Sequence, residues 1–293
     1  MKPDGRRMGA EEFIDGIAAL PSPPAMLQDV LHAADHGTFN QIARLVERDL
    51  GLAARVLRIA NSAFYGAGDR ISNVPMALGR LGTRELKGVI LSSLMVDTFK
   101  GLRDALDLES FWRHSFASGI ASRLLSSPSQ LDADQLSLGD NPFYMAGLLH
   151  HVGILAEALQ DPAGFARARA VAAAQGHSLA EAEACVFGFD HAEAGAVLLE
   201  RWRFPEETSD AARYHLRPDE AVRNLETVRV VHLSAMLCHE LGPVDSYEGV
   251  APWFSERAFY ELGWTQAQLP ALVEKLKATI TRAGQFSDAV LCR

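Results

Sequence analysis

The chain has 293 residues, of which 48% are hydrophobic and 22% are charged, which is ordinary for a globular protein with enough length to bury a large core. Its 28 basic and 37 acidic residues give a formal net charge of -9, and no basic run is longer than a pair such as Arg6 and Arg7. Proteins that bind nucleic acid normally carry a basic stripe, so we expect no direct nucleic-acid partner.

Cysteine usage and hydropathy narrow the class of protein further. Cys185, Cys238 and Cys292 are far apart and odd in number, which matches neither a disulfide framework nor a CxxC metal site. Such a pattern suits a reducing compartment. No apolar run approaches the roughly 18 residues that a membrane span needs, and the polar N-terminus lacks the apolar segment of a signal peptide. We therefore expect a cytoplasmic protein of bacterial type with no membrane partner.

Helical periodicity runs through most of the chain, and no segment is typical of a strand. Residues 38–49 begin with Thr38 and Gln41 in the spacing of a capping box, and an apolar stripe follows them. Residues 84–99 are rich in Leu, Val, Ile and Met, which predicts a largely buried helix. The predicted fold class is all-α, a multi-helix bundle.

We expect two parts in this bundle. An N-terminal helical subdomain is predicted over residues 13–105. A larger helical bundle is predicted over residues 106–293, and its last part forms a C-terminal helical extension.

The N-terminal half contains three short motifs. They are Leu-Pro-Ser-Pro-Pro at residues 20–24, Leu-Arg-Ile-Ala-Asn-Ser-Ala at residues 57–63, and Ile-Ser-Asn-Val-Pro-Met-Ala followed by Leu-Gly-Arg-Leu-Gly at residues 71–82. Within the second motif, Asn61 and Ser62 fall where a helix should end. Short polar side chains at such a position satisfy free backbone groups or begin a turn, so we assign them a structural role.

The C-terminal half contains a second block of motifs. Residues 146–155 read Ala-Gly-Leu-Leu-His-His-Val-Gly-Ile-Leu, a small-residue helix ending in two adjacent histidines. Further histidines stand before and after it, at His114, His191 and His215.

Together the two blocks resemble the HDOD family (HD-related output domain), a degenerate relative of the HD and HD-GYP metal-dependent phosphohydrolases. The likeness covers about residues 13–216. It implies an HD-like helical bundle that serves as an output module in bacterial signal transduction, usually without catalysis, with a link to cyclic-dinucleotide pathways. Because no receiver or cyclase domain fits before residue 13, we expect a stand-alone regulatory protein that acts through contacts with signalling proteins.

The resemblance also assigns candidate metal ligands. In an active HD site, a His, an adjacent His-Asp pair and a later Asp hold the metal, and a Lys lies near phosphate. By position, His114 and His150 match the two histidines, but His151 replaces the Asp and Ile154 replaces the Lys. The later Asp would fall near Leu233, Ser234 and Ala235, where no carboxylate is present. The remaining candidate metal ligands, which include two matches to the extra histidines of the two-metal subgroup, are His114, His150, His151, His191 and His215.

A site built from neutral imidazoles alone disfavours Mg²⁺ and Mn²⁺, which prefer oxygen ligands, and favours Zn²⁺ or Ni²⁺. We therefore expect no catalytic residue and no required cofactor, with Zn²⁺ or Ni²⁺ as the ion if this remnant site binds one.

Two alternatives remain open from the sequence. A carboxylate that reaches the cleft from elsewhere, such as Glu157, Asp190 or Glu193, would restore a metal-dependent phosphohydrolase or phosphodiesterase. The cleft would otherwise serve as a sensor for a nucleotide or another small ligand. Each histidine also has a simpler interpretation as a buried, hydrogen-bonded core residue, and Asp190 with Glu193 is first a helix cap.

Overall fold

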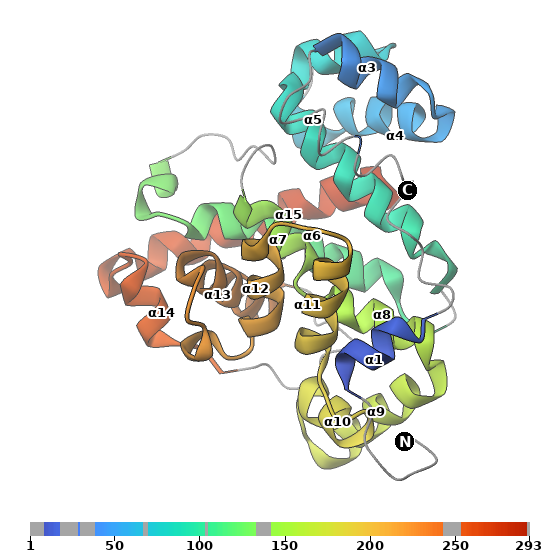
Figure 1. The fold of residues 1–293 in the computed structure, drawn as a ribbon. Helices are drawn as coiled ribbons and strands as arrows, with labels where there is room; N and C mark the ends of the chain where they lie inside the picture. The colour runs from blue at the N-terminus through green and yellow to red at the C-terminus, as the bar shows by residue number, and fades with distance from the viewer. Residues whose placement is uncertain are drawn as a thin grey trace.

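The computed structural model describes residues 9–17, 29, 39–66, 70–102, 105–132, 142–242 and 253–291. Over these residues the protein is all-helical and has no strand, which confirms the predicted fold class (Figure 1). Thr38 and the Leu20–Pro24 motif lie outside the described residues. The α-helices are α1 (Ala10–Asp15), α3 (Phe39–Glu47), α4 (Leu50–Ala60), α5 (Val74–Thr98), α6 (Leu108–Leu125), α7 (Pro142–Leu149), α8 (Val152–Gln160), α9 (Pro162–Gln175), α10 (Leu179–Val186), α11 (His191–Arg201), α12 (Glu206–Tyr214), α13 (Leu225–Leu241), α14 (Glu256–Glu261) and α15 (Leu269–Leu291).

Short polar side chains begin many of these helices. The Asp49 carboxylate accepts the Leu52 N–H at the start of α4, and Ser178 forms a reciprocal capping box with Glu181 at the start of α10. Each such cap satisfies a backbone donor that the first helical turn leaves open. Side-chain caps of the same kind stand at Asn73, Asp107, Asp161, Asp190 and Ser255.

Helices α3, α4 and the first part of α5 form a small lobe at the top of Figure 1. Gly82 interrupts α5 with a φ of 79°, a conformation that favours glycine, and the helix continues beyond it into the main body. Most residues beyond the kink are buried, with Leu86, Val89 and Ile90 fully enclosed. The prediction of a buried helix at residues 84–99 is therefore confirmed.

Asn61 joins the end of α4 to the segment that leads into α5. Its Nδ2 donates to the carbonyl oxygens of Leu57 and Ile71, both at 2.8 Å, and its Oδ1 accepts the Ile71 N–H at 2.9 Å. The predicted structural role of Asn61 is confirmed.

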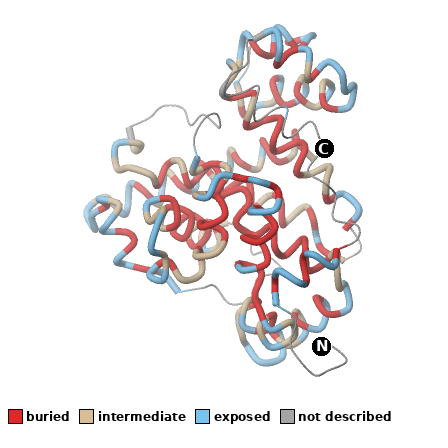
Figure 2. Tube along the Cα trace, in the orientation of Figure 1, coloured by how far each residue is buried: buried red, intermediate tan, exposed pale blue. Residues whose placement is uncertain are grey.

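Helix α6 lies at the centre of the main bundle, where it packs against α7, α13 and α15. Buried residues concentrate along these central helices (Figure 2). The first helix, α1, packs against α8 and α11 in the main bundle. The division at residues 105 and 106 stays a prediction.

The C-terminal helix α15 belongs to the core. Its Phe286 is fully buried, and the ring packs 5.2 Å from Phe64 of the upper lobe and 5.2 Å from Phe116 of α6. At the end of α6, the indole N–H of Trp264 donates to the Leu125 carbonyl at 2.9 Å. The contact between Phe286 and Phe64 joins the two halves of the chain. None of the helices is long and apolar enough to span a membrane within the described residues.

Candidate functional site

All five predicted histidines meet in one buried cluster. His114 comes from α6, His150 and His151 lie between α7 and α8, His191 begins α11, and His215 follows α12. Each of these residues is at most 4% exposed. His151 is central: its ring centroid lies 3.7 Å from that of His150 and 5.1 Å from those of the other three.

Two glycines allow the helices to come this close. A Cβ on Gly153 would stand 2.0 Å from the His191 carbonyl oxygen, so the start of α8 lies directly against α11. A Cβ on Gly147 would stand 2.4 Å from Ser122 Oγ and 2.8 Å from the Ser118 carbonyl, so α7 lies equally close to α6. The small residues of the 146–155 motif thus bring four helical elements together around the histidines.

Backbone hydrogen bonds fix the tautomers of two rings. His150 Nδ1 lies 2.7 Å from the Gly147 carbonyl oxygen, and His215 Nδ1 lies 2.7 Å from that of Ala212. A carbonyl oxygen only accepts, so Nδ1 carries the proton in both rings and Nε2 carries the lone pair. His150 Nε2 is buried and has no hydrogen-bond partner among the described residues.

A third ring is oriented by a carboxylate that the sequence analysis did not select. His191 Nδ1 lies 2.6 Å from Glu183 Oε2, and the same oxygen accepts the His191 backbone N–H at 2.9 Å. Glu183 is completely buried in α10. Its position on the apolar face of that helix, one turn after Leu179, is the signal in the sequence that would have identified it.

Burial keeps the centre of the cluster uncharged. The pKa values of His150 and His151 are lowered well below the usual range, first by burial and then by the neighbouring imidazoles. His239 of α13 is also close enough to contribute to the effect on His151. His150 and His151 are therefore neutral imidazoles, the form in which histidine binds metals.

None of the three carboxylates proposed from the sequence joins the ring nitrogens in a metal-binding group among the described residues. Glu157 is fully buried, and burial followed by its neighbour Glu183 raises its pKa well above the usual range. Asp190 caps α11 and forms an ion pair with Arg217 at 2.8 Å. Burial would raise the pKa of Asp190, but His191 and Arg217 outweigh burial and lower it. Glu193 is exposed on α11.

The positions of the missing HD residues have other uses. Ser234 lies in the stretch where the closing Asp is predicted to fall, and its Oγ lies 2.7 Å from Ser122 Oγ, joining α13 to α6. Ile154, in place of the Lys, is fully buried in α8. Both positions contribute to packing.

Two overlapping triads have the spacing of a metal site: His114 with His150 and His151, and His151 with His191 and His215. Within each triad one ring nitrogen per residue lies within 4.8 Å of the others. These donors do not fit the carboxylate-supported centre of an HD phosphohydrolase. An all-imidazole set fits Zn²⁺ or Ni²⁺ better than Mg²⁺ or Mn²⁺.

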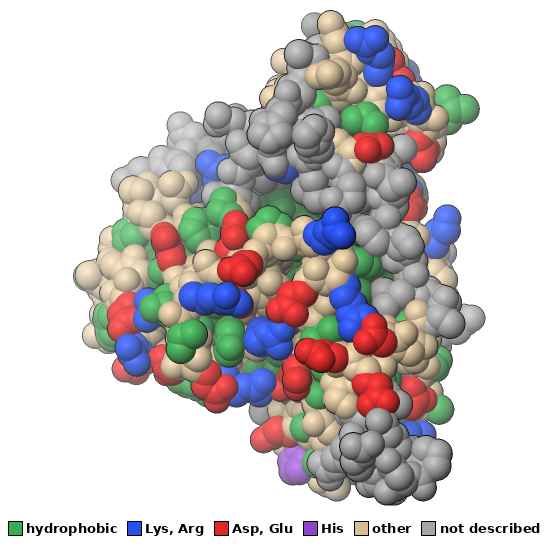
Figure 3. Space-filling model, in the orientation of Figure 1, with side chains coloured by type: hydrophobic (Ala, Val, Ile, Leu, Met, Phe, Trp, Pro, Cys, Tyr) green, Lys and Arg blue, Asp and Glu red, His purple; other side chains and the backbone are tan. Residues whose placement is uncertain are grey.

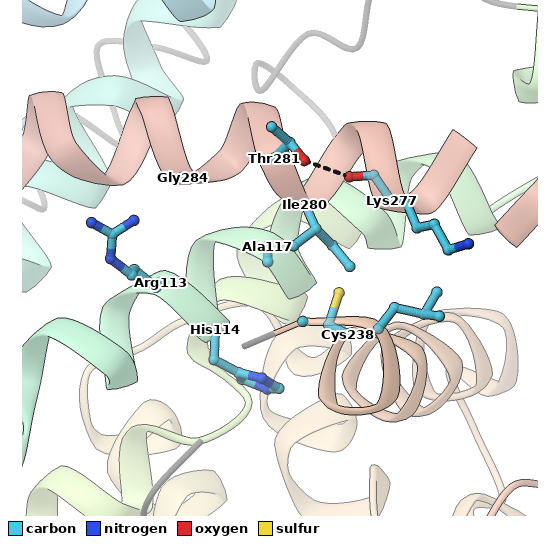
Figure 4. A pocket seen from close by; sticks show the side chains of 10 residues that line it. Arg113, His114, Ala117, Cys238, Lys277, Ile280, Thr281 and Gly284 are labelled. Carbon is cyan, nitrogen blue, oxygen red and sulfur yellow. Dashed lines mark hydrogen bonds between the residues drawn. The ribbon is translucent and has the colours of Figure 1, made fainter. Parts of the chain in front are cut away.

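A pocket of about 460 Å³ borders the cluster between α6, α13 and α15 (Figure 4). His114 lines it, so this residue belongs to both the pocket and the cluster. Arg113 and Lys277 also line it, but both form ion pairs with nearby carboxylates. The apolar part of the lining includes Ala117 and Ile280.

The motifs and this geometry agree with the sequence comparison, in which the HDOD domain matches residues 20–218. The chain belongs to the HDOD family. A solved HDOD domain protein of unknown function from Geobacter sulfurreducens superimposes with a TM-score of 0.78 at 24% identity, covering 96% of each chain. Fold similarity extends to a candidate phosphohydrolase from Shewanella amazonensis SB2B, with a TM-score of 0.71 at 22% identity over 95% of this chain and 97% of that one.

One curated relative is longer than this chain. An uncharacterized protein of Treponema pallidum (strain Nichols) is 24% identical over 208 residues, which is 70% of this chain and 39% of that protein. The matched region therefore spans well under half of that relative.

Proposed function

We propose that this HDOD protein is a non-catalytic regulator in signal transduction that acts through contacts with other proteins. The observation that carries the proposal is the donor set of the HD-like centre. Five imidazoles converge there, and among the described residues no carboxylate joins them as a ligand. Hydrolysis of phosphate esters at such a centre requires a metal-activated water and a clamp on the phosphate oxygens, and the residues present lack the usual carboxylate support.

Burial supports the same conclusion. The five histidines are at most 4% exposed, and the position that an HD enzyme uses for phosphate is an enclosed isoleucine. A phosphodiester would need an open cleft at this point. The helical scaffold therefore leaves the outer surface for function.

The family comparison supports a signalling role. A solved protein from Marinobacter aquaeolei VT8, named as a candidate signal transduction protein, shares the fold with a TM-score of 0.70 at 24% identity over 97% of this chain and 63% of that one. The mixed surface charge favours protein partners over nucleic acid: acidic and basic side chains are interspersed across the described residues on the face seen in Figure 3.

Photo-crosslinking in the organism that encodes the chain tests the proposal. A crosslinking amino acid would replace one exposed apolar side chain at a time, at Leu50, Val222, Trp253 or Tyr260. Exposed Gln175 on α9 provides a matched polar control position. We expect a discrete protein adduct from at least one apolar position and none from residue 175. Absence of an adduct at all four apolar positions contradicts the proposal.

A further inference from the structure

We propose that the triad of His151, His191 and His215 binds one divalent ion of borderline softness, Zn²⁺ or Ni²⁺. This site goes beyond the proposed signalling role and does not depend on it. The Glu183 carboxylate supports the site from behind the His191 ring.

The tautomers of two of the three rings prepare them to donate electron pairs. Nδ1 of His215 donates to a backbone carbonyl, and Nδ1 of His191 faces Glu183. In both rings this leaves Nε2 as the ligand atom. A metal-bound histidine commonly donates its other N–H to a carboxylate or carbonyl, which fixes the ring and increases its basicity. Both arrangements are present here: the His215 ring contacts a carbonyl, and the His191 ring contacts a carboxylate.

A nearby carboxylate favours this triad over the triad of His114, His150 and His151. Glu183 lies in direct contact with His191 and supplies an anionic oxygen close to the ion. In the other triad, the group beside a ring nitrogen is a neutral hydroxyl: His114 Nε2 lies 3.2 Å from Ser118 Oγ. A divalent ion in a buried site needs a compensating negative charge, and Glu183 is placed to provide it.

A fourth ring contributes a buried nitrogen beside the site. His150 Nε2 is buried and has no hydrogen-bond partner among the described residues. Buried polar atoms are normally satisfied by protein, water or an ion. His150 lies against both His151 and His215, with centroids 3.7 and 5.0 Å away, so its nitrogen stands beside the proposed site.

His114 connects the pocket in Figure 4 to the proposed site. His114 lines the pocket and stacks on His151 with an interplanar angle of 15°. An ion that enters between α6, α13 and α15 meets His114 first and reaches the central His151 next. His114 is therefore an access residue and not a required ligand.

The test is metal binding by tag-free protein treated with chelator and then dialysed. Isothermal titration with ZnCl₂, NiCl₂ and MgCl₂ measures affinity and stoichiometry, and Co²⁺ reports the ligand set through its visible absorption bands. We expect one equivalent of Zn²⁺ or Ni²⁺, no Mg²⁺ binding, and a rise in melting temperature with the bound ion.

Variants identify the ligands. Glu183→Gln should weaken metal binding about 10–100-fold, which is the usual effect of losing a carboxylate that hydrogen-bonds a metal-ligating histidine. His191→Gln should abolish the Co²⁺ bands, whereas His177→Ala, a histidine outside the cluster, should change nothing. The proposal is overturned if wild-type protein binds well under one equivalent, or if folded Glu183→Gln binds with wild-type affinity. The wild-type stoichiometry decides the matter even if a variant fails to fold.

Discussion

The Nδ1 nitrogen of His191 lies 2.6 Å from the Oε2 oxygen of Glu183, and both side chains are buried. One carboxylate oxygen thus receives two N–H groups at the point where α10 meets the start of α11. Glu183→Ala should lower the free energy of unfolding by roughly 3 kcal/mol, because it leaves a buried donor unpaired. Urea denaturation measures the change.

Two matched variants separate this effect from the general loss of a charge. Glu183→Gln keeps an acceptor at the same place and should lower the free energy of unfolding by about half as much. Glu193→Gln changes an exposed carboxyl two residues from His191 and should have an effect within about 0.5 kcal/mol. Equal stability of the Ala and Gln variants at residue 183 would show that the hydrogen bonds contribute little.

Gly153 is predicted to be the least replaceable small residue beside the cluster. Gly153→Ala would place a methyl group 2.0 Å from the His191 carbonyl oxygen, so α8 and α11 must separate. We expect a loss of about 3 kcal/mol, at the upper end for overpacking. Gly79→Ala in α5 is the control, because nothing lies within 4 Å of its added Cβ, and it should stabilise the helix by about 0.5–1 kcal/mol. A neutral Gly153→Ala would mean that the two helices are not in direct contact.

Glu157 should make stability depend on pH in a definite direction. Its pKa in the folded protein is raised, so the folded state holds a proton that the unfolded state releases at lower pH. Its stabilising contribution is present below the unfolded pKa of about 4.3 and is lost as the pH rises through the folded pKa. Glu157→Gln should therefore raise the melting temperature at pH 7 and flatten the decline in stability above about pH 4.5.

Glu274→Gln, an exposed change in α15, controls for the loss of one formal charge. It should leave the pH dependence as in the wild type. A Glu157→Gln variant that is less stable than wild type at pH 7 would show that the ionised carboxylate is needed in the fold.

The C-terminal helix should be essential to folding although it lies beyond the HDOD match. Phe286 packs against Phe64 and Phe116, so Phe286→Ala should lower the free energy of unfolding by about 3–5 kcal/mol. Tyr260→Ala, which truncates an aromatic side chain that is 53% exposed, is the control and should change stability by less than about 1 kcal/mol. Similar effects of the two substitutions would indicate that α15 is only loosely attached.

Much of the fold could be predicted from local patterns. The apolar segment at residues 84–99 forms the buried part of α5. Asp190 caps α11, as its spacing with Glu193 indicates. The kink at Gly82 was not predicted, because one glycine in an apolar helix does not reveal its φ angle. The packing of α1 against α8 and α11 depends on contacts between residues far apart in the sequence, which periodicity does not encode.

The candidate site, too, could be predicted from the sequence only in part. The resemblance to the HDOD family located five histidines that the structure brings into one cluster, centred on His151. It did not locate Glu183, because that residue contacts the cluster only through His191. His239 was missed for a similar reason: its proximity to His151 comes from the packing of α13. Residues that contact the clustered histidines in this way are brought there by the tertiary structure, so no fixed spacing in the sequence identifies them.

The HD-like centre is predicted not to hydrolyse phosphate esters. The most direct measurement is turnover of bis(p-nitrophenyl) phosphate and of a cyclic dinucleotide by protein reconstituted separately with Mn²⁺, Fe²⁺, Zn²⁺ and Ni²⁺. The comparison is a His150→Ala/His151→Ala variant shown to be folded. We predict that the wild-type rate equals the variant rate with every ion. Turnover by the wild type that disappears in the variant would contradict the account and identify the protein as a phosphohydrolase with a histidine-rich centre.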